Sequence, residues 1–225
     1  MTAKVIVTRP RPGLDDTLAR ARAVGLDAVG HPLSEIEPRG WHGPDPEQVD
    51  ALLVGSANAI RHGGEELRRY GGKPVHAVGK ATAEAARRAG FAVASVGSGG
   101  LQSVADTIRP PSRLLRVAGA EHVPLGVAEG VSVTTVIAYE AVPLALPEAL
   151  RDMQQHDLVV MLHSAGAAAQ LAKEARRLEL DPSRIALAAI GPRVAAAAGD
   201  GWRAIHVCDT PSDAALLDMV RRACL

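Results

Sequence analysis

A strand-turn-helix unit is written twice in this 225-residue chain, with the copies about 110 residues apart. The first copy holds the turns Gly55-Ser56-Ala57-Asn58 and Val78-Gly79-Lys80-Ala81-Thr82; the second holds His163-Ser164-Ala165-Gly166 and Ile190-Gly191-Pro192-Arg193. One such unit cannot bury its own apolar face, so a duplicated unit predicts two similar α/β lobes. Two lobes in turn predict a cleft as the ligand site.

Short apolar runs alternate with helical patterns along the whole chain. Strands are expected near residues 4–8, 27–31, 50–55, 74–78, 92–96, 113–118, 132–142, 157–163, 185–190 and 203–207. Helices are expected near 12–25, 57–70, 80–90, 100–109, 121–129, 146–154, 165–179, 192–199 and 211–222. This alternation is typical of parallel sheets covered on both faces, so each lobe is predicted to be flavodoxin-like or Rossmann-like.

Two extended, proline-bounded segments break the alternation, at about residues 32–38 and 137–143. They predict a two-stranded linker between the lobes. Lobe 1 is then discontinuous and consists of residues 1–33 with 143–225, whereas residues 36–138 form lobe 2 as an insertion. Two crossings would hinge the lobes more stiffly than one crossing.

The composition of the chain restricts which molecules it is expected to bind and where it is expected to be found. The 25 basic residues balance the 25 acidic ones, so global charge gives no case for nucleic acid or an anionic membrane. The chain enters a strand at once and has no apolar run of transmembrane length, which predicts a cytoplasmic protein. Cys208 and Cys224 lack CxxC spacing and are expected to be reduced.

The four turns of the duplicated unit are candidate anion sites. In a parallel sheet, helix N-termini follow the carboxyl ends of the strands, where unpaired N–H groups and the helix dipole attract anions. Ser56 and Ser164 are also N-cap candidates. For one turn alone, capping and chain reversal explain the residues better; for four duplicated turns at one cleft, anion binding is favoured.

Other chemistries have weaker support. The glycine cluster at 97–100 lacks the rest of a dinucleotide fingerprint, and there is no P-loop lysine motif. The eight histidines are scattered without metal-ligand spacing, and His163 beside Ser164 has no aspartate in evident register for a hydrolytic triad. Tyr139 lies in a linker strand, where its phenol could donate a proton or simply pack the hinge.

Several segments together resemble the uroporphyrinogen-III synthase family. They are Val5-Ile6-Val7-Thr8-Arg9-Pro10, Gly55-Ser56-Ala57-Asn58-Ala59, Ala77-Val78-Gly79 with Thr82-Ala83, Leu115 to Gly119, Ile137-Ala138-Tyr139-Glu140, His163-Ser164, Ile190-Gly191-Pro192 and Thr210-Pro211-Ser212. The resemblance implies an enzyme, a cyclising lyase that closes hydroxymethylbilane to uroporphyrinogen III. The terminal hydroxyl leaves as water, ring D is inverted through a spiro intermediate, and neither cofactor nor metal takes part.

The resemblance also assigns roles to residues. Tyr139 takes the family's tyrosine position and is expected to assist hydroxyl departure. The eight substrate carboxylates are expected to meet hydroxyl or backbone donors at Thr8, Ser56, Ala57, Asn58, Gly79, Thr82, Gly119, Ser164, Gly166 and Gly191. Arg9 adds charge there or lies on a sheet-edge surface. Where members of the family often have threonine, this chain has Val194, so Arg193 either replaces that contact or points to solvent.

A two-lobed sensor or regulatory protein that binds a small anion is the alternative function, because fold alone does not separate the two. The enzyme hypothesis implies a linear tetrapyrrole as small-molecule partner. It further implies a monomer that makes transient contact with the upstream deaminase.

Overall fold

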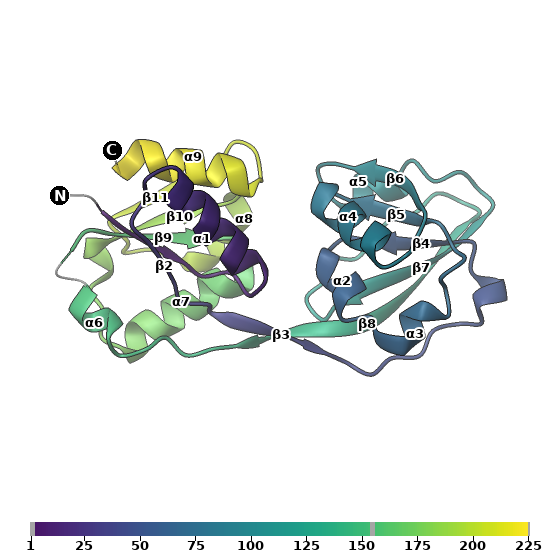
Figure 1. Ribbon diagram of the computed structural model, residues 1–225, viewed down its shortest axis with the longest axis horizontal. Coiled ribbons are helices and arrows are strands. Elements are labelled where there is room, and N and C mark those ends of the chain that lie inside the picture. The colour runs from purple at the N-terminus through teal and green to yellow at the C-terminus, as the bar shows by residue number, and fades with distance from the viewer. Residues whose placement is uncertain (1–2, 154–155, 225) are drawn as a thin grey trace. The chain divides into compact units, whose positions relative to one another are not determined.

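The computed structural model describes residues 3–153 and 156–224, and the chain divides into two compact units (Figure 1). Unit 1 comprises Met1–Glu35 with Val142–Leu225, and unit 2 comprises Ile36–Ala141. Each unit is an α/β layer structure built on a parallel sheet. Because the polypeptide enters unit 2 from unit 1 and returns to it, unit 1 is assembled from both ends of the chain.

The sheet of unit 1 has five parallel strands in the order β11-β10-β9-β1-β2. The strands are β1 (Lys4–Val7), β2 (Ala28–Gly30), β9 (Leu158–Leu162), β10 (Ile185–Ala189) and β11 (Ala204–Val207). The two central strands β9 and β10 are buried along their whole length and consist of Leu, Val, Met, Ile and Ala. Such uninterrupted apolar runs are what a strand covered on both faces requires.

Helices cover both faces of this sheet. They are α1 (Gly13–Ala23), α6 (Leu150–Met153), α7 (Ala165–Arg177), α8 (Pro192–Ala198), α9 (Asp213–Cys224) and the 3-10 helix η2 (Pro182–Arg184). α1 and α9 pack against one face through Leu14, Ala21, Leu216 and Val220. α7 and α8 pack against the other face through residues that include Leu171, Ala175 and Val194. The core of unit 1 therefore has two apolar layers.

The sheet of unit 2 has the order β3-β8-β7-β4-β5-β6. Its strands are β3 (Ser34–Pro38), β4 (Ala51–Val54), β5 (Val75–Val78), β6 (Val93–Gly97), β7 (Ser112–Gly119) and β8 (Val131–Pro143), and all neighbouring pairs from β8 to β6 are parallel. α2 (Ala57–Arg61), α3 (Gly64–Arg68) and α4 (Lys80–Arg88) pack on one face, and α5 (Leu101–Ala105) packs on the other. The 3-10 helix η1 (Pro46–Gln48) precedes β4.

The two sheets share one spatial arrangement but are connected differently. In each sheet three consecutive strand-helix units, β4 to β6 or β9 to β11, form one side. The other side is β7 and β8 in unit 2 and β1 and β2 in unit 1. When the linker strand β3 is left out and the strands are numbered within each unit, the order is 3-2-1-4-5 in unit 2, as in a Rossmann half, and 2-1-3-4-5 in unit 1, as in flavodoxin. The units are thus similar lobes related by circular permutation.

β3 and β8 carry the chain between the units. The Arg39 N–H donates to the Ala138 carbonyl at 2.8 Å, and the Leu144 N–H donates to the Leu33 carbonyl at 2.9 Å. In these two bonds residue numbers rise on one segment as they fall on the other, so the segments run antiparallel. The connection is two-stranded.

Some predicted helices are wrong or shorter. Residues 121–129 form no helix: the Val123 and Gly126 carbonyls accept side-chain hydrogen bonds from Arg116 and Gln102, and Pro124 interrupts the segment. The helix expected at 57–70 splits into α2 and α3 around Gly63, because Gly64 adopts a positive φ of 64°. The helix expected at 100–109 is only Leu101–Ala105. The one expected at 146–154 is Leu150–Met153, and residue 154 lies outside the described residues.

Within residues 3–153 and 156–224, no helix is both long and apolar enough to span a membrane.

Candidate active site

The first turn of unit 2 joins β4 to α2. The Ser56 hydroxyl accepts the Asn58 N–H at 3.2 Å and is the N-cap of α2. A capping hydroxyl still has its own proton to donate, and the Ala57 N–H has no partner within the helix. The Asn58 side chain accepts a hydrogen bond from Arg61 at 3.2 Å. Ser56 and Ala57 can therefore each offer a donor, although capping already explains the serine.

The second turn of unit 2 joins β5 to α4, and here one expectation is wrong. Gly79 needs its glycine because φ is 77°, but its N–H donates to the Gly97 carbonyl at 2.9 Å and is not open to a ligand. The open donors come next. Ala83 is the first residue of α4 whose N–H returns to the turn, to the Gly79 carbonyl. The N–H groups of residues 80–82 are left without helical partners, and no side chain caps them.

Thr82 is 5% exposed, and no described residue forms a hydrogen bond with its hydroxyl. Thr82 lies in the first turn of α4, the turn that also contains the unpaired N–H groups. A threonine at this position therefore has donor capacity that the fold of unit 2 does not use.

Tyr139 lies on β8 beside the end of β7. Its backbone carbonyl accepts the Ala120 N–H at 2.9 Å, and its ring is half-buried against the unit 2 core. A Cβ on Gly119 would lie 2.7 Å from ring carbons of Tyr139 and 3.0 Å from the phenol oxygen, so only glycine leaves room for the ring. The His62 ring is 6.3 Å away, centroid to centroid, and burial followed by the charge of Arg61 lowers the pKa of His62.

The corresponding turns of unit 1 are less open. The exposed Ser164 accepts the Ala167 N–H at 3.1 Å as N-cap of α7, which leaves the Gly166 N–H among the unpaired donors of the first turn. At α8, Pro192 has no N–H, and Val194 already donates to the Gly191 carbonyl.

Arg193 is exposed and makes no ion pair with any described residue, whereas Val194 is 7% exposed and packs in the core. At the position of Thr82, the second copy of the turn therefore contributes packing.

Thr8 and Arg9 follow β1 and are used inside unit 1. Thr8 is fully buried, and its hydroxyl donates to the Met161 carbonyl at 2.7 Å, so its expected contact with a ligand carboxylate is wrong. Arg9 donates to Asp213 at 3.3 Å and to the Thr17 hydroxyl at 3.2 Å. Its side chain is 30% exposed, so Arg9 is neither a free charge nor a plain surface residue.

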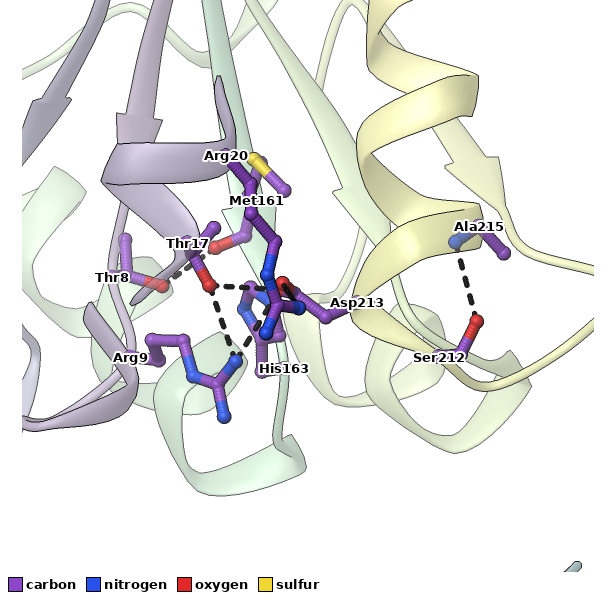
Figure 2. Close-up of polar contacts among 9 residues, drawn as sticks. All are labelled: Thr8, Arg9, Thr17, Arg20, Met161, His163, Ser212, Asp213 and Ala215. Atoms are coloured by element: carbon purple, nitrogen blue, oxygen red, sulfur yellow. Dashed lines mark hydrogen bonds and ion pairs between the residues drawn. The ribbon is translucent and has the colours of Figure 1, made fainter. Parts of the chain in front are cut away.

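Asp213 is the centre of a network that the sequence did not reveal. Figure 2 shows four side chains meeting its carboxylate: Arg9, Thr17, Arg20 and His163. The network joins β1, α1, the end of β9 and the start of α9. Since His163 immediately precedes Ser164, the bond from His163 to Asp213 also fixes the turn at the N-terminus of α7.

Burial, hydrogen bonds and neighbouring charges together determine the pKa values of Asp213 and His163 in this network. Burial would by itself raise the pKa of Asp213, but hydrogen bonds from His163 and Thr17 and nearby positive charge lower it to about 2. Burial lowers the pKa of His163 below 6.5, and Asp213 offsets this only in part. An ionised carboxylate can only accept, so neutral His163 donates its Nε2 proton to Asp213 at 2.9 Å.

No aspartate is in evident register with His163 in the sequence, but the fold brings Asp213 to it. However, His163 Nδ1 is buried with no partner among the described residues, and the Ser164 hydroxyl caps α7, so the pair does not activate a serine. A sequence signal existed: His163 comes directly after β9 and Asp213 begins the helix that follows β11, and the carboxyl ends of parallel strands share one edge. Strand order was needed to see that α9 begins beside β9.

Metal and cysteine chemistry have no visible support in the part of the chain that the structure describes. There, no three His, Cys, Asp or Glu side chains come together as a metal site. Cys208 is buried and free, and burial raises the pKa of its thiol, which makes the reactive thiolate less available.

A family model described as "Uroporphyrinogen-III synthase HemD" matches residues 15–218. Among solved structures, the chain is similar to uroporphyrinogen-III synthetase from Helicobacter pylori, with 16% identity and a TM-score of 0.64 over 99% of this chain and 100% of that one. It is also similar to a mutant uroporphyrinogen III synthase from the extremely thermophilic bacterium Thermus thermophilus, with 19% identity and a TM-score of 0.55 over 98% of each chain. No curated protein sequence matches the chain.

Proposed function

Because this chain belongs to the uroporphyrinogen-III synthase family, we propose that it closes hydroxymethylbilane to uroporphyrinogen III with Tyr139 as the catalytic residue. It is an enzyme of tetrapyrrole biosynthesis, a cyclising lyase. The match over residues 15–218 carries this conclusion, since it spans both units and every turn described above. No observation favours the alternative of an anion-binding regulator.

Tyr139 is proposed to assist the first bond cleavage. The carbon–oxygen bond of the terminal hydroxymethyl group breaks, the electron pair stays with oxygen, and the oxygen leaves as water once it is protonated. A phenol hydrogen bond to that oxygen would favour its departure. The room that Gly119 leaves for the ring supports this placement, because the contact holds the ring at the carboxyl end of β7.

The substrate's carboxylates are proposed to bind mainly at the open donors of unit 2. These are the Ser56 hydroxyl, the Ala57 N–H, the N–H groups of residues 80–82 and the Thr82 hydroxyl. Ser164 and the Gly166 N–H are the corresponding donors of unit 1. With the substrate held in one conformation, positioning can supply much of the catalysis, because ring closure competes with uncatalysed closure to the uninverted isomer.

The test is the isomer formed from freshly prepared hydroxymethylbilane. We expect uroporphyrinogen III, read by chromatography of the oxidised products, against the type I isomer in a control without protein. Tyr139→Phe is expected to slow turnover about 100-fold while leaving affinity for product nearly unchanged. Type I product alone from the wild-type protein would refute the proposed function; an unchanged rate in Tyr139→Phe would leave Tyr139 a packing residue.

Assembly is a separate part of the proposal. We propose that the chain acts as a monomer and takes its unstable substrate during transient contact with the deaminase that precedes it. Sedimentation of the purified chain and a comparison of isomer yield with and without that deaminase test the two points.

A further inference from the structure

Unit 2 contains a buried arginine whose charge has no counterpart. Arg116, on β7, is 6% exposed, yet no carboxylate among the described residues lies within ion-pair distance of its guanidinium. A buried guanidinium normally has an acidic partner, because leaving a charge desolvated and unpaired is costly. Burial lowers the pKa of Arg116, but an arginine remains protonated near neutral pH.

The guanidinium uses one edge and leaves the other without a hydrogen-bond partner among the described residues. Its Nη1 donates to the Val123 carbonyl at 2.7 Å, whereas its Nε is buried without a hydrogen-bond partner. Nε and Nη2 form the side of a guanidinium that binds both oxygens of a carboxylate in parallel. The edge that lacks a partner is therefore the edge suited to a carboxylate.

The matching position in unit 1 shows that the fold does not need this charge. Leu53 on β4 precedes the N-cap Ser56 by three residues and pairs with Arg116; Met161 on β9 precedes the N-cap Ser164 by three residues and pairs with Val7. Val7 is fully buried in an apolar layer. The same place in two similar sheets thus holds valine in one and arginine in the other.

The hydrogen bond of Arg116 connects it to the loop that follows β7. Val123, which it contacts, lies four residues beyond the end of β7 at Gly119, where Tyr139 packs. Tyr139 lies close enough to affect the electrostatics of Arg116. The covering loop, residues 120–130, has no regular secondary structure.

We propose that Arg116 binds one carboxylate of the tetrapyrrole substrate beside Tyr139, with the Val123 carbonyl holding the guanidinium in place. This inference rests on the proposed function. It identifies a charged group within unit 2 for a substrate that carries eight carboxylates, in addition to the hydroxyl and backbone donors.

The experiment compares Arg116→Met and Arg116→Lys with Arg113→Met in steady-state turnover of hydroxymethylbilane. Arg116→Met is expected to raise KM about tenfold or more with little change in kcat, because a charge-assisted hydrogen bond is lost. The free energy of unfolding is not expected to fall, since an unpaired buried charge is removed. Arg113 is on the same strand but is half-exposed and bound to Asp50, so Arg113→Met should leave KM unchanged.

A KM within twofold of wild type in Arg116→Met would overturn the inference. If that variant does not fold, Arg116→Lys decides: it keeps the charge but lacks the paired donors, and KM should rise several-fold. An unchanged KM in the lysine variant contradicts the carboxylate contact. Type I isomer from the wild-type protein would instead refute the proposed function, so the two failures are distinguishable.

Discussion

The two units place similar strands and turns in the same spatial order but treat buried charge in opposite ways. In unit 1, Asp213 is surrounded by four donors, and the 3%-exposed Glu174 accepts from Arg177 and the Leu146 N–H. In unit 2, Arg116 has no acidic partner among the described residues. Donors that are paired inside the protein stabilise its fold, whereas unpaired ones are available to a ligand. The comparison therefore supports the proposal that unit 2 contributes most of the anion-binding groups.

The largest expected effect removes the centre of the unit 1 network. Asp213→Ala leaves Arg9 and His163 without their carboxylate and should cost about 2–3 kcal/mol of unfolding free energy, less than a fully buried pair because the arginines are partly hydrated. The chain has two tryptophans, Trp202 in unit 1 and Trp41 in unit 2, so urea unfolding followed in single-tryptophan variants reports each unit.

The loss should appear in the Trp202 transition and not in the Trp41 transition. Asp218→Ala is the matched control on the same helix, because Asp218 pairs only with exposed arginines among the described residues. Equal shifts of both transitions would contradict a network that stabilises unit 1 alone.

The next effect concerns the space that Gly119 leaves beside the Tyr139 ring in unit 2. Gly119→Ala forces a methyl group against the Tyr139 ring and should lower kcat about tenfold, on the order of 1.4 kcal/mol, without a loss of similar size in unfolding free energy. Gly40→Ala is the control, because a Cβ there meets no atom within 4 Å. If Gly119→Ala turns over hydroxymethylbilane at the wild-type rate, the ring position does not limit catalysis.

The smallest effect is a pH dependence of unit 1. His163 has a folded pKa below its unfolded value of 6.5, because burial disfavours its charged form. The unfolded chain therefore binds a proton more readily, and stability should be highest above pH 6.5 and fall as the pH decreases through that value. Asp213, with a pKa of about 2, stays ionised throughout this window and contributes no change there.

His163→Gln should flatten part of this dependence in the Trp202 transition, while the exposed His206→Gln should not. His31, in the same unit, also has a pKa lowered by burial. The contribution of His163 is therefore the difference in pH slope between the wild type and His163→Gln, and not the total slope of the wild type. An identical slope in His163→Gln and wild type would mean that His163 does not titrate in this range.

Much of the fold was readable because it depends on local chemistry. Apolar runs such as Leu158–Leu162 predicted buried strands, and Ser56 and Ser164 predicted helix starts, since a hydroxyl beside an apolar strand satisfies unpaired N–H groups. The helix predicted at 121–129 is wrong because the tertiary partners Arg116 and Gln102 bond to that backbone. Local patterns carry no information about such partners.

The candidate site likewise contains residues that the sequence could predict and residues that it could not. Ser56, Thr82 and Tyr139 could be named from their turns and strands, and their places in the structure are compatible with the proposed roles. The burial of Thr8, the occupied N–H of Gly79 and the pairing of His163 with Asp213 could not be foreseen. Each depends on which strands are neighbours, and a permuted sheet hides that order from the sequence.

Two similar α/β lobes and four turns that could bind anions were predictable from the residues alone, because duplication, period and capping residues act over short stretches of chain. Which of those donors are free became visible in the folded chain. Whether a hydroxyl, an N–H or a guanidinium is paired depends on atoms far away in the chain, as with Thr8 and Met161. The duplicated unit therefore predicts two similar pairs of turns that differ at Thr82 and Val194, and long-range pairing adds further differences between them.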